Sequence, residues 1–150
     1  MILIIDDDIA VRTSLLLLFQ NEGYTAVSVD SQDEALSVIT KKNVSLVILD
    51  LNFSIETSGK EGMTLLQNIK NIHAAIPVIL LTGWGTIELA VQGMKLGAND
   101  FINKPWSNEH LLQSVKTLLQ LQEKKPVHQT RKQLDNKYDY KNVIGEDPLL

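Results

Sequence analysis

Four short apolar runs in this sequence each end in a side chain that can contact phosphate or a metal ion. In an open parallel sheet, ligands gather in the crevice beyond the carboxyl ends of the strands, where residues distant in the sequence meet. The pattern therefore predicts one crevice that can bind a divalent cation and a phosphoryl group. The runs and the residues that follow them are 2–5 with Asp6 and Asp7, 46–49 with Asp50, 78–81 with Thr82, and 101–103 with Lys104.

Segments with helical periodicity separate these runs and a further run at residues 26–29, and the alternation predicts an α/β fold of five βα units around a parallel sheet. Capping residues support the expected helices. Gly23 and Gly97 end two of them, Ser31 with Glu34 forms a capping-box pattern, and Ser107 begins the last. The expected helices cover about residues 9–21, the segment after Ser31, and then 62–71, 87–96 and 107–124.

Composition narrows the possible functions. The formal net charge of -4, from 14 basic and 18 acidic residues, gives no electrostatic reason to expect nucleic-acid binding by this segment. The absence of cysteine excludes disulfides, thiolate metal sites and cysteine nucleophiles. The first apolar run stops at Asp6, too early for a signal peptide or a membrane span, so we expect a cytoplasmic protein without membrane contact.

The character of the chain changes after residue 122. Residues 123–137 are mostly polar and contain a Lys-Lys-Pro sequence at 124–126 that breaks the helical pattern, which predicts a linker. Residues 138–150 regain apolar side chains but are too short to form a core. We therefore expect one domain over residues 1–122, a linker over 123–137, and the beginning of a truncated domain over 138–150.

The acidic residues at the expected strand ends indicate a metal site. Two carboxylates held about 4 Å apart at an effective dielectric of about 20 repel by roughly 4 kcal/mol. A hard cation removes that repulsion, and Mg²⁺ suits a site of a few carboxylates, waters and phosphate oxygens. Taken alone, Asp6 and Asp7 could equally form a solvated loop that caps a helix, but Asp50 closes a fully apolar run.

The same residues predict phosphoryl chemistry. A carboxylate such as Asp50 can attack phosphorus to form an acyl phosphate if charge on the phosphoryl oxygens is neutralised, which Lys104 and a metal would do. Thr82 could donate its hydroxyl to another phosphoryl oxygen. Thr82 could instead simply end a strand and Lys104 lie on the surface, but their joint position favours the site. A cis bond between Lys104 and Pro105 would aim the lysine into the crevice.

With these residues in this order, residues 1–122 resemble the receiver domains of two-component response regulators. The resemblance implies a flavodoxin-like, doubly wound, five-stranded parallel sheet of order 2-1-3-4-5. It also implies that Asp50 accepts phosphate from a sensor histidine kinase. We therefore expect a protein that gains and loses its own phosphoryl group rather than a turnover enzyme.

The resemblance further implies individual roles for the site residues. Asp7, Asp50 and the backbone carbonyl of Asn52 would bind Mg²⁺ directly, and Asp6 would act mainly through water. Lys104 would pair with Asp50 or its phosphate. The switch pair would be Thr82, which moves toward the phosphoryl group, and Phe101, which turns inward.

Residues 82–101 look most like receivers of the sigma-54-dependent, nitrogen-regulation type. Residues 138–148 are similar to the opening of the AAA+ ATPase domain that follows such receivers, although its phosphate-binding loop is absent. The chain thus resembles a receiver and linker from a transcriptional activator. The full-length activator would contact sigma-54 RNA polymerase and DNA.

Two features depart from the family pattern, and a separate feature, the extended last helix, suggests a dimer. Ser54 stands where many receivers carry proline, and the segment 52–59 looks about one residue longer than usual. Trp84 either overhangs the crevice or packs on the fourth helix. The apolar residues 118–121 extend the last helix, which predicts a homodimer through the fourth helix, fifth strand, fifth helix and linker, unless this helix packs entirely on its own domain.

Other readings account for fewer of these residues. A haloacid-dehalogenase-like, Mg²⁺-dependent phosphohydrolase would use Asp6 and Asp8, but it needs a second acidic motif late in the chain and gives Asp50 no role. A P-loop NTPase is excluded because no G-x-x-x-x-G-K-[ST] motif precedes residues 46–50. A phosphate-independent receiver would usually lack one of the acids, the threonine or the lysine.

Overall fold

The computed structural model describes residues 1–51, 60–83 and 87–124, and divides the chain into two units, Met1–Lys116 and Thr117–Leu150. The first unit contains a five-stranded sheet of order β2-β1-β3-β4-β5, with every described strand pair parallel. This is the flavodoxin-like order predicted above. The elements are β1 (Ile2–Ile5), α1 (Ile9–Asn21), β2 (Ala26–Val29), α2 (Gln32–Lys41), β3 (Leu46–Asp50), α3 (Lys60–Ile72), β4 (Val78–Thr82), α4 (Ile87–Lys95), β5 (Asp100–Asn103) and α5 (Asn108–Lys124).

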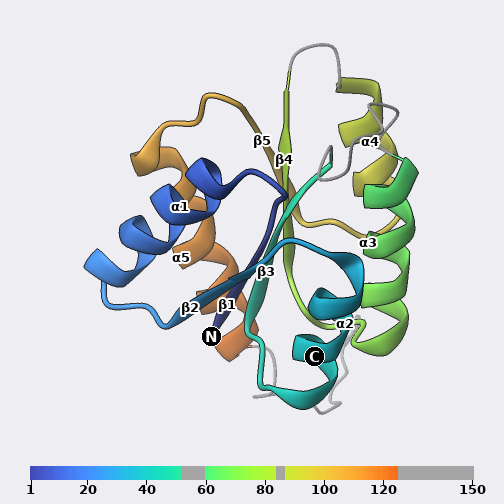
Figure 1. The fold of residues 1–150 in the computed structure, drawn as a ribbon, viewed down its shortest axis with the longest axis horizontal. Coiled ribbons are helices and arrows are strands. Elements are labelled where there is room, and N and C mark those ends of the chain that lie inside the picture. Colours follow the sequence, from blue (N-terminus) through green and yellow to red (C-terminus); the bar gives the residue numbers. More distant parts are fainter. Residues whose placement is uncertain (52–59, 84–86, 125–150) are drawn as a thin grey trace, which may run out of the picture. The chain divides into compact units, whose positions relative to one another are not determined.

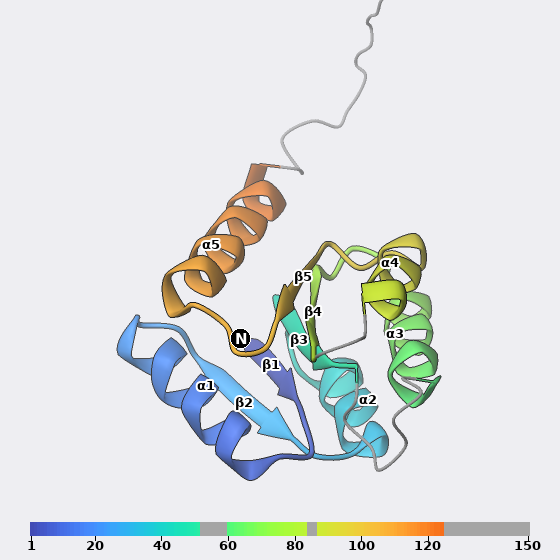
Figure 2. The same cartoon turned by 90° about the horizontal axis from the view of Figure 1, so that it is seen from above.

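Helices cover both faces of the sheet. Helix α1 and the first part of α5 lie on one face, and α2, α3 and α4 lie on the other (Figures 1 and 2). The three central strands, β1, β3 and β4, are buried along their whole length, whereas the edge strands β2 and β5 are only partly buried. A strand covered on both faces must be apolar throughout, and this is why the central strands read as continuous apolar runs.

The helix ends follow the predicted capping. The hydroxyl of Ser31 accepts a hydrogen bond from the Glu34 backbone N–H at 3.2 Å, and the hydroxyl of Ser107 accepts one from the backbone N–H of His110 at 3.4 Å. Gly23 and Gly97 have φ angles of +90° and +114°, in the left-handed region that favours glycine. These contacts confirm the predicted caps.

Helix α3 begins at Lys60, two residues before the predicted start, and passes very close to the end of β3. A Cβ atom added at Gly62 would lie 2.7 Å from the carbonyl oxygen of Leu51, a distance that side chains do not tolerate. Gly62 therefore allows α3 to approach the strand end that carries Asp50. This close approach depends on tertiary packing, so helical periodicity alone did not reveal it.

Two predictions about the rest of the chain can be compared with this description. Among the described residues, no helix combines the length and apolar character needed to cross a membrane. Residues 125–150 lie outside the described residues, so the predicted linker over 123–137 and truncated domain over 138–150 stay predictions.

Candidate functional site

The predicted acidic cluster forms at the carboxyl end of the sheet. Asp6 directly follows β1 and Asp50 ends β3, two strands that pair side by side. Ligand oxygens from Asp6, Asp7 and Asp50 all lie within 4.8 Å of one another. Asp6 and Asp50 are buried, and Asp7 is exposed, so the cluster has a dry side against the sheet and an open side toward solvent.

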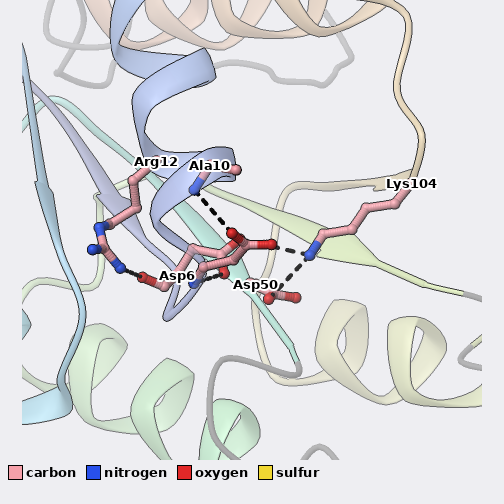
Figure 3. A network of polar contacts seen from close by, with 6 residues as sticks. Asp6, Ala10, Arg12, Asp50 and Lys104 are labelled. Carbon is pink, nitrogen blue, oxygen red and sulfur yellow. Dashed lines mark hydrogen bonds and ion pairs between the residues drawn. The ribbon is translucent and has the colours of Figure 1, made fainter.

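Asp6 lies in the loop between β1 and α1, and hydrogen bonds fix both its backbone and its side chain (Figure 3). Its backbone N–H donates to the carbonyl of Val29 at 3.2 Å, and its Oδ1 accepts from the backbone N–H of Asp8 at 3.0 Å. Its carbonyl oxygen accepts a hydrogen bond from Nη1 of Arg12 at 2.7 Å. These contacts leave only Oδ2 of the carboxylate to face the cluster.

Asp8 has a local role in the same loop. Its side chain accepts a hydrogen bond from the backbone N–H of Ala10 at 2.9 Å and so caps α1. The phosphohydrolase reading needs Asp8 as a reacting group beside Asp6. Its use as a helix cap gives that reading no support.

Lys104 reaches the cluster from the segment that follows β5. Its Nζ lies 3.1 Å from Oδ2 of Asp50 and 3.6 Å from Oδ2 of Asp6. Burial lowers the pKa of Lys104, but attraction to Asp50 and then Asp6 outweighs burial and raises the pKa above its ordinary value. The ammonium group therefore stays charged at neutral pH. The Lys104–Pro105 peptide bond is cis, as considered from the sequence.

Asp6 carries the electrostatic cost of the site. Among the described residues, 1–51, 60–83 and 87–124, its buried Oδ2 has no hydrogen-bond partner, because 3.6 Å to Lys104 is within ion-pair range but too long for a hydrogen bond. Burial is the main cause that raises the pKa of Asp6 from 3.8 to about 7, with a further contribution from repulsion by Asp50. The N–H of Asp8 and the charge of Lys104 offset only part of this increase.

These residues fit a hard divalent cation. Three carboxylate oxygens within 4.8 Å are close to the span of roughly 4 Å across a magnesium ion whose ligands lie about 2.1 Å away. Within the described ranges, the buried Oδ2 of Asp6 also lacks the hydrogen-bond partner that buried polar atoms normally have. An ion, or a water bound to it, would satisfy that oxygen and relieve the repulsion between carboxylates.

The two residues of the predicted switch lie on neighbouring strands. Thr82 is fully buried at the end of β4, and Phe101 is half-buried on β5, where it packs against the core. The hydroxyl of Thr82 donates to Oδ1 of Asn103 at 2.7 Å. The predicted ligand Asn52, together with Ser54 and Trp84, lies outside the described residues.

Sequence reasoning missed Arg12 and Asn103, which contact predicted site residues. Arg12 lies in α1, six residues after Asp6, so helical geometry allows it to reach back to the strand end. Asn103 could have been found from the alignment of strand ends, since it pairs with Thr82 in the register of β4 and β5. Neither residue belongs to the motif that identified the site.

Comparisons with known proteins agree with this geometry. The family model for the response regulator receiver domain matches residues 2–116. A putative NtrX-like response regulator of Rickettsia typhi is 38% identical over 111 residues, which cover 74% of this chain and 23% of that protein. The transcriptional regulatory protein FixJ of Bradyrhizobium diazoefficiens is 31% identical over 118 residues, 79% of this chain and 56% of that protein.

The fold is also that of solved receiver domains. The crystal structure of the receiver domain of NtrX from Brucella abortus is similar with a TM-score of 0.74 and 32% identity, over 80% of this chain and 98% of that one. The chain spans about a quarter of the length of the NtrX-like relatives and nearly the whole of this isolated domain. It belongs to the family of response regulator receiver domains.

Proposed function

We propose that this receiver accepts a phosphoryl group on Asp50 from a sensor histidine kinase and thereby controls an attached transcriptional activator. One observation carries the proposal. The carboxylate of Asp50 is 3% exposed, lies 3.1 Å from the ammonium of Lys104, and shares a cluster within 4.8 Å with Asp6 and Asp7. A candidate nucleophile, a lysine cation and carboxylates that could bind a metal thus meet at the carboxyl end of the sheet.

The proposed reaction is a transfer between two side chains. A carboxylate oxygen of Asp50 attacks phosphorus in the phosphohistidine of the kinase, an O–P bond forms, and the P–N bond breaks with its electron pair returning to the imidazole nitrogen. Lys104 remains beside Asp50 and balances the added negative charge. Its raised pKa supports this role, because the ammonium stays protonated throughout the physiological pH range.

Asp7 and Asp50 would hold Mg²⁺ together with the carbonyl of Asn52, and Asp6 would contact the ion mainly through water. When bound, the ion would neutralise charge on the phosphoryl oxygens during transfer. The Oδ2 of Asp6 supports this assignment, since it has no hydrogen-bond partner in the part of the chain that the structure describes and a cation or its water would satisfy it. The role of Asn52 rests on the family resemblance.

The response would pass through Thr82 and Phe101. In this proposal the Thr82 hydroxyl donates to a phosphoryl oxygen, and Phe101 turns further inward to fill the space that Thr82 leaves. The full burial of Thr82 and the partial burial of Phe101 support the pairing, because a displaced buried side chain requires neighbouring atoms to repack.

The output would be a change in self-association. On α4, Val91 and Met94 are 45% and 37% exposed, and Leu121 in α5 is 59% exposed. Exposed apolar side chains of this size are typical of association surfaces, and the interface that we propose involves α4, β5, α5 and the linker. The resemblance to sigma-54-dependent regulators supports an AAA+ activator as the attached part, with sigma-54 RNA polymerase and DNA as the partners of the whole protein.

The phosphoacceptor role is tested by intact mass after incubation with Mg²⁺ and acetyl phosphate. We expect one acid- and base-labile phosphoryl group on the parent protein and none on Asp50→Asn. Asp33→Asn, which changes an exposed acid in α2, should be labelled as fully as the parent. Full labelling of Asp50→Asn combined with loss of labelling in Asp6→Asn would instead favour the phosphohydrolase chemistry.

The output is tested by sedimentation over a concentration series, with and without the phosphoryl mimic beryllofluoride. We expect different association curves in the two states, because a ligand shifts an equilibrium only through different affinities for its two forms. Thr82→Ala should weaken this difference while leaving Asp50 able to accept phosphate. Identical curves for the occupied and empty parent protein would contradict the proposed output.

A further inference from the structure

Asn103 holds the hydroxyl group of Thr82 in the phosphate-free protein. Thr82 ends β4, Asn103 ends β5, and the two residues are direct partners in the register of these parallel strands. Residues paired in this way project from the same face of a sheet. Their side chains therefore meet, and Oγ1 of Thr82 donates to Oδ1 of Asn103 at 2.7 Å.

The backbone next to this contact is fixed as well. The backbone N–H of Lys104 donates to the carbonyl oxygen of Thr82 at 2.7 Å. Thr82 is fully buried, whereas Asn103, which accepts the hydrogen bond from its hydroxyl, is exposed to solvent. Two hydrogen bonds thus hold Thr82 to the segment that positions Lys104.

The chemistry of a hydroxyl group makes this contact consequential. A threonine hydroxyl carries a single proton, so it donates one hydrogen bond at a time. While the proton is donated to Asn103, it is not available to a phosphoryl oxygen on Asp50. Phosphorylation must therefore exchange the bond to Asn103 for a bond to the phosphoryl group.

We infer that Asn103 is a positioning residue that restrains Thr82 in the unphosphorylated state and so sets the threshold for switching. The inference rests on the proposed function, in which Thr82 donates to the phosphoryl group. Asn103 touches no reacting atom and acts only through the Thr82 hydroxyl. Its hydrogen bond stabilises one of two states, and the free energy of that bond opposes the shift that phosphate drives.

Removal of the Asn103 acceptor should therefore make the phosphorylated form easier to reach. The test is calorimetric titration of the magnesium-loaded protein with beryllofluoride. For Asn103→Ala we expect a dissociation constant roughly two- to tenfold lower than that of the parent, the factor that corresponds to one hydrogen bond of ordinary net strength. Asn103→Val, which also lacks an acceptor and suits a strand, should behave in the same way.

Two further variants isolate the pathway. In a Thr82→Ala background, Asn103→Ala should leave the dissociation constant unchanged, because the group through which it acts is gone. Asn108→Ala is the matched control, since Asn108 is also exposed and its Oδ1 accepts from Nε1 of Trp106 at 3.0 Å, away from Thr82. This control should bind beryllofluoride as the parent does.

The possible outcomes distinguish failure of the role of Asn103 from failure of the proposed phosphoacceptor function. Unchanged or weaker binding by Asn103→Ala, or an equal gain in the Thr82→Ala background, would overturn the role of Asn103 while the phosphoacceptor function stands. A purely structural role would lower thermal stability without tightening binding, so tighter binding supports the restraint. A parent protein that binds no beryllofluoride would overturn the proposed function and this inference with it.

Discussion

The polar groups at the amino ends and at the carboxyl ends of the strands differ in how far hydrogen bonds satisfy them. At the amino end of β4, the Val78 N–H donates to Oδ1 of Asn99 at 3.0 Å, and the Asn99 N–H donates to the Val78 carbonyl at 2.8 Å. Lys70 donates to the carbonyl of Ile76 at 2.6 Å beside them. At the carboxyl end, Lys104 faces a group of carboxylates, and Oδ2 of Asp6 finds no hydrogen-bond partner among the residues that the structure describes.

The difference indicates that the carboxyl end of the sheet lowers the free energy of unfolding, which we attribute to its proposed function. The Val78 N–H, the Asn99 N–H and the Lys70 ammonium each meet an acceptor, so these contacts join α3, β4 and the segment before β5 in the folded state. The carboxyl end buries like charges, which is unfavourable unless a counter-ion or ligand compensates. The proposed binding of a cation and a phosphoryl group would provide this compensation, and titratable groups with shifted pKa values are typical of functional sites.

The largest predicted effect comes from removal of a charge at the carboxyl end. The folded-state pKa of Asp6, about 7, exceeds its ordinary 3.8, so the folded protein binds this proton more tightly than the unfolded chain does. The free energy of unfolding should then fall as pH rises between these values. The fall is at most about 4 kcal/mol, at about 1.4 kcal/mol per pKa unit.

For Asp6→Asn, the free energy of unfolding should not fall in this way as pH rises. The variant should therefore be more stable than the parent at pH 8 without metal. Asparagine keeps the Oδ1 acceptor for the Asp8 N–H, so the loop geometry is retained. Urea unfolding in EDTA at several pH values measures the difference. Parallel stability curves for the parent and the variant would show that the buried carboxylate carries no such cost.

The next effect is stabilisation of the folded protein by Mg²⁺ bound at the acidic cluster of Asp6, Asp7 and Asp50. A ligand that binds only the folded state, at a hundredfold excess over its dissociation constant, raises the free energy of unfolding by about 2.7 kcal/mol. We expect Mg²⁺ to do so in the parent and to lose most of this effect in Asp7→Ala, which should be at least as stable as the parent without metal. Melting curves with and without Mg²⁺ measure both quantities.

The exposed acid Asp33 in α2 provides the control for magnesium. Asp33→Ala should keep the full stabilisation by Mg²⁺, because this residue lies outside the acidic cluster. A full magnesium effect in Asp7→Ala would contradict the assignment of Asp7 as a ligand.

The amino end should respond in the opposite direction. Asn99→Ala removes the acceptor of the Val78 N–H, and an unsatisfied buried group of this kind costs about 1–3 kcal/mol. We therefore expect lower stability with unchanged phosphorylation by acetyl phosphate. Urea unfolding measures the stability, and intact mass after incubation with acetyl phosphate measures the phosphorylation. Asn71→Ala, an exposed position in α3, should change neither.

The smallest effect concerns the loop that carries the acids. Arg12→Met removes the donor to the Asp6 carbonyl at 2.7 Å and should lower stability by about 1 kcal/mol, an ordinary net value for a hydrogen bond. Because the loop also directs Asp7, magnesium affinity should fall as well. Calorimetric titration with Mg²⁺ measures this, and Arg12→Lys separates loss of charge from loss of geometry. Equal affinity in the parent and Arg12→Met would mean that the acids position themselves without Arg12.

Much of the fold was predictable because local patterns and tertiary packing agree. The bounds of β1, α1 and β2 coincide with those predicted, since apolar runs and capping residues act over a few neighbouring residues. Element ends shifted where long-range contacts decide them. β3 and β4 extend by one residue to include Asp50 and Thr82, because Asp50 pairs with Leu81 and Thr82 with Asn103 in the strand register.

The sequence by itself determined which residues gather at the site. The carboxyl ends of parallel strands lie at one end of the sheet, so the order of Asp6, Asp50, Thr82 and Lys104 along the chain was sufficient to predict that they would lie there together, while their chemistry stays a prediction. The family resemblance followed from the same residues, and the family model confirms it.

Only the tertiary structure decided how these residues are held. The ion pair between Lys104 and Oδ2 of Asp6, the hydrogen bond from Arg12 to the Asp6 carbonyl, and the hydrogen bond from Thr82 to Asn103 all depend on distances between separate elements. Strand register and helix packing set those distances, and they result from burial across the whole sheet. A local pattern of residue types therefore predicts the members of the site, whereas their hydrogen bonds and pKa values arise from the packed fold.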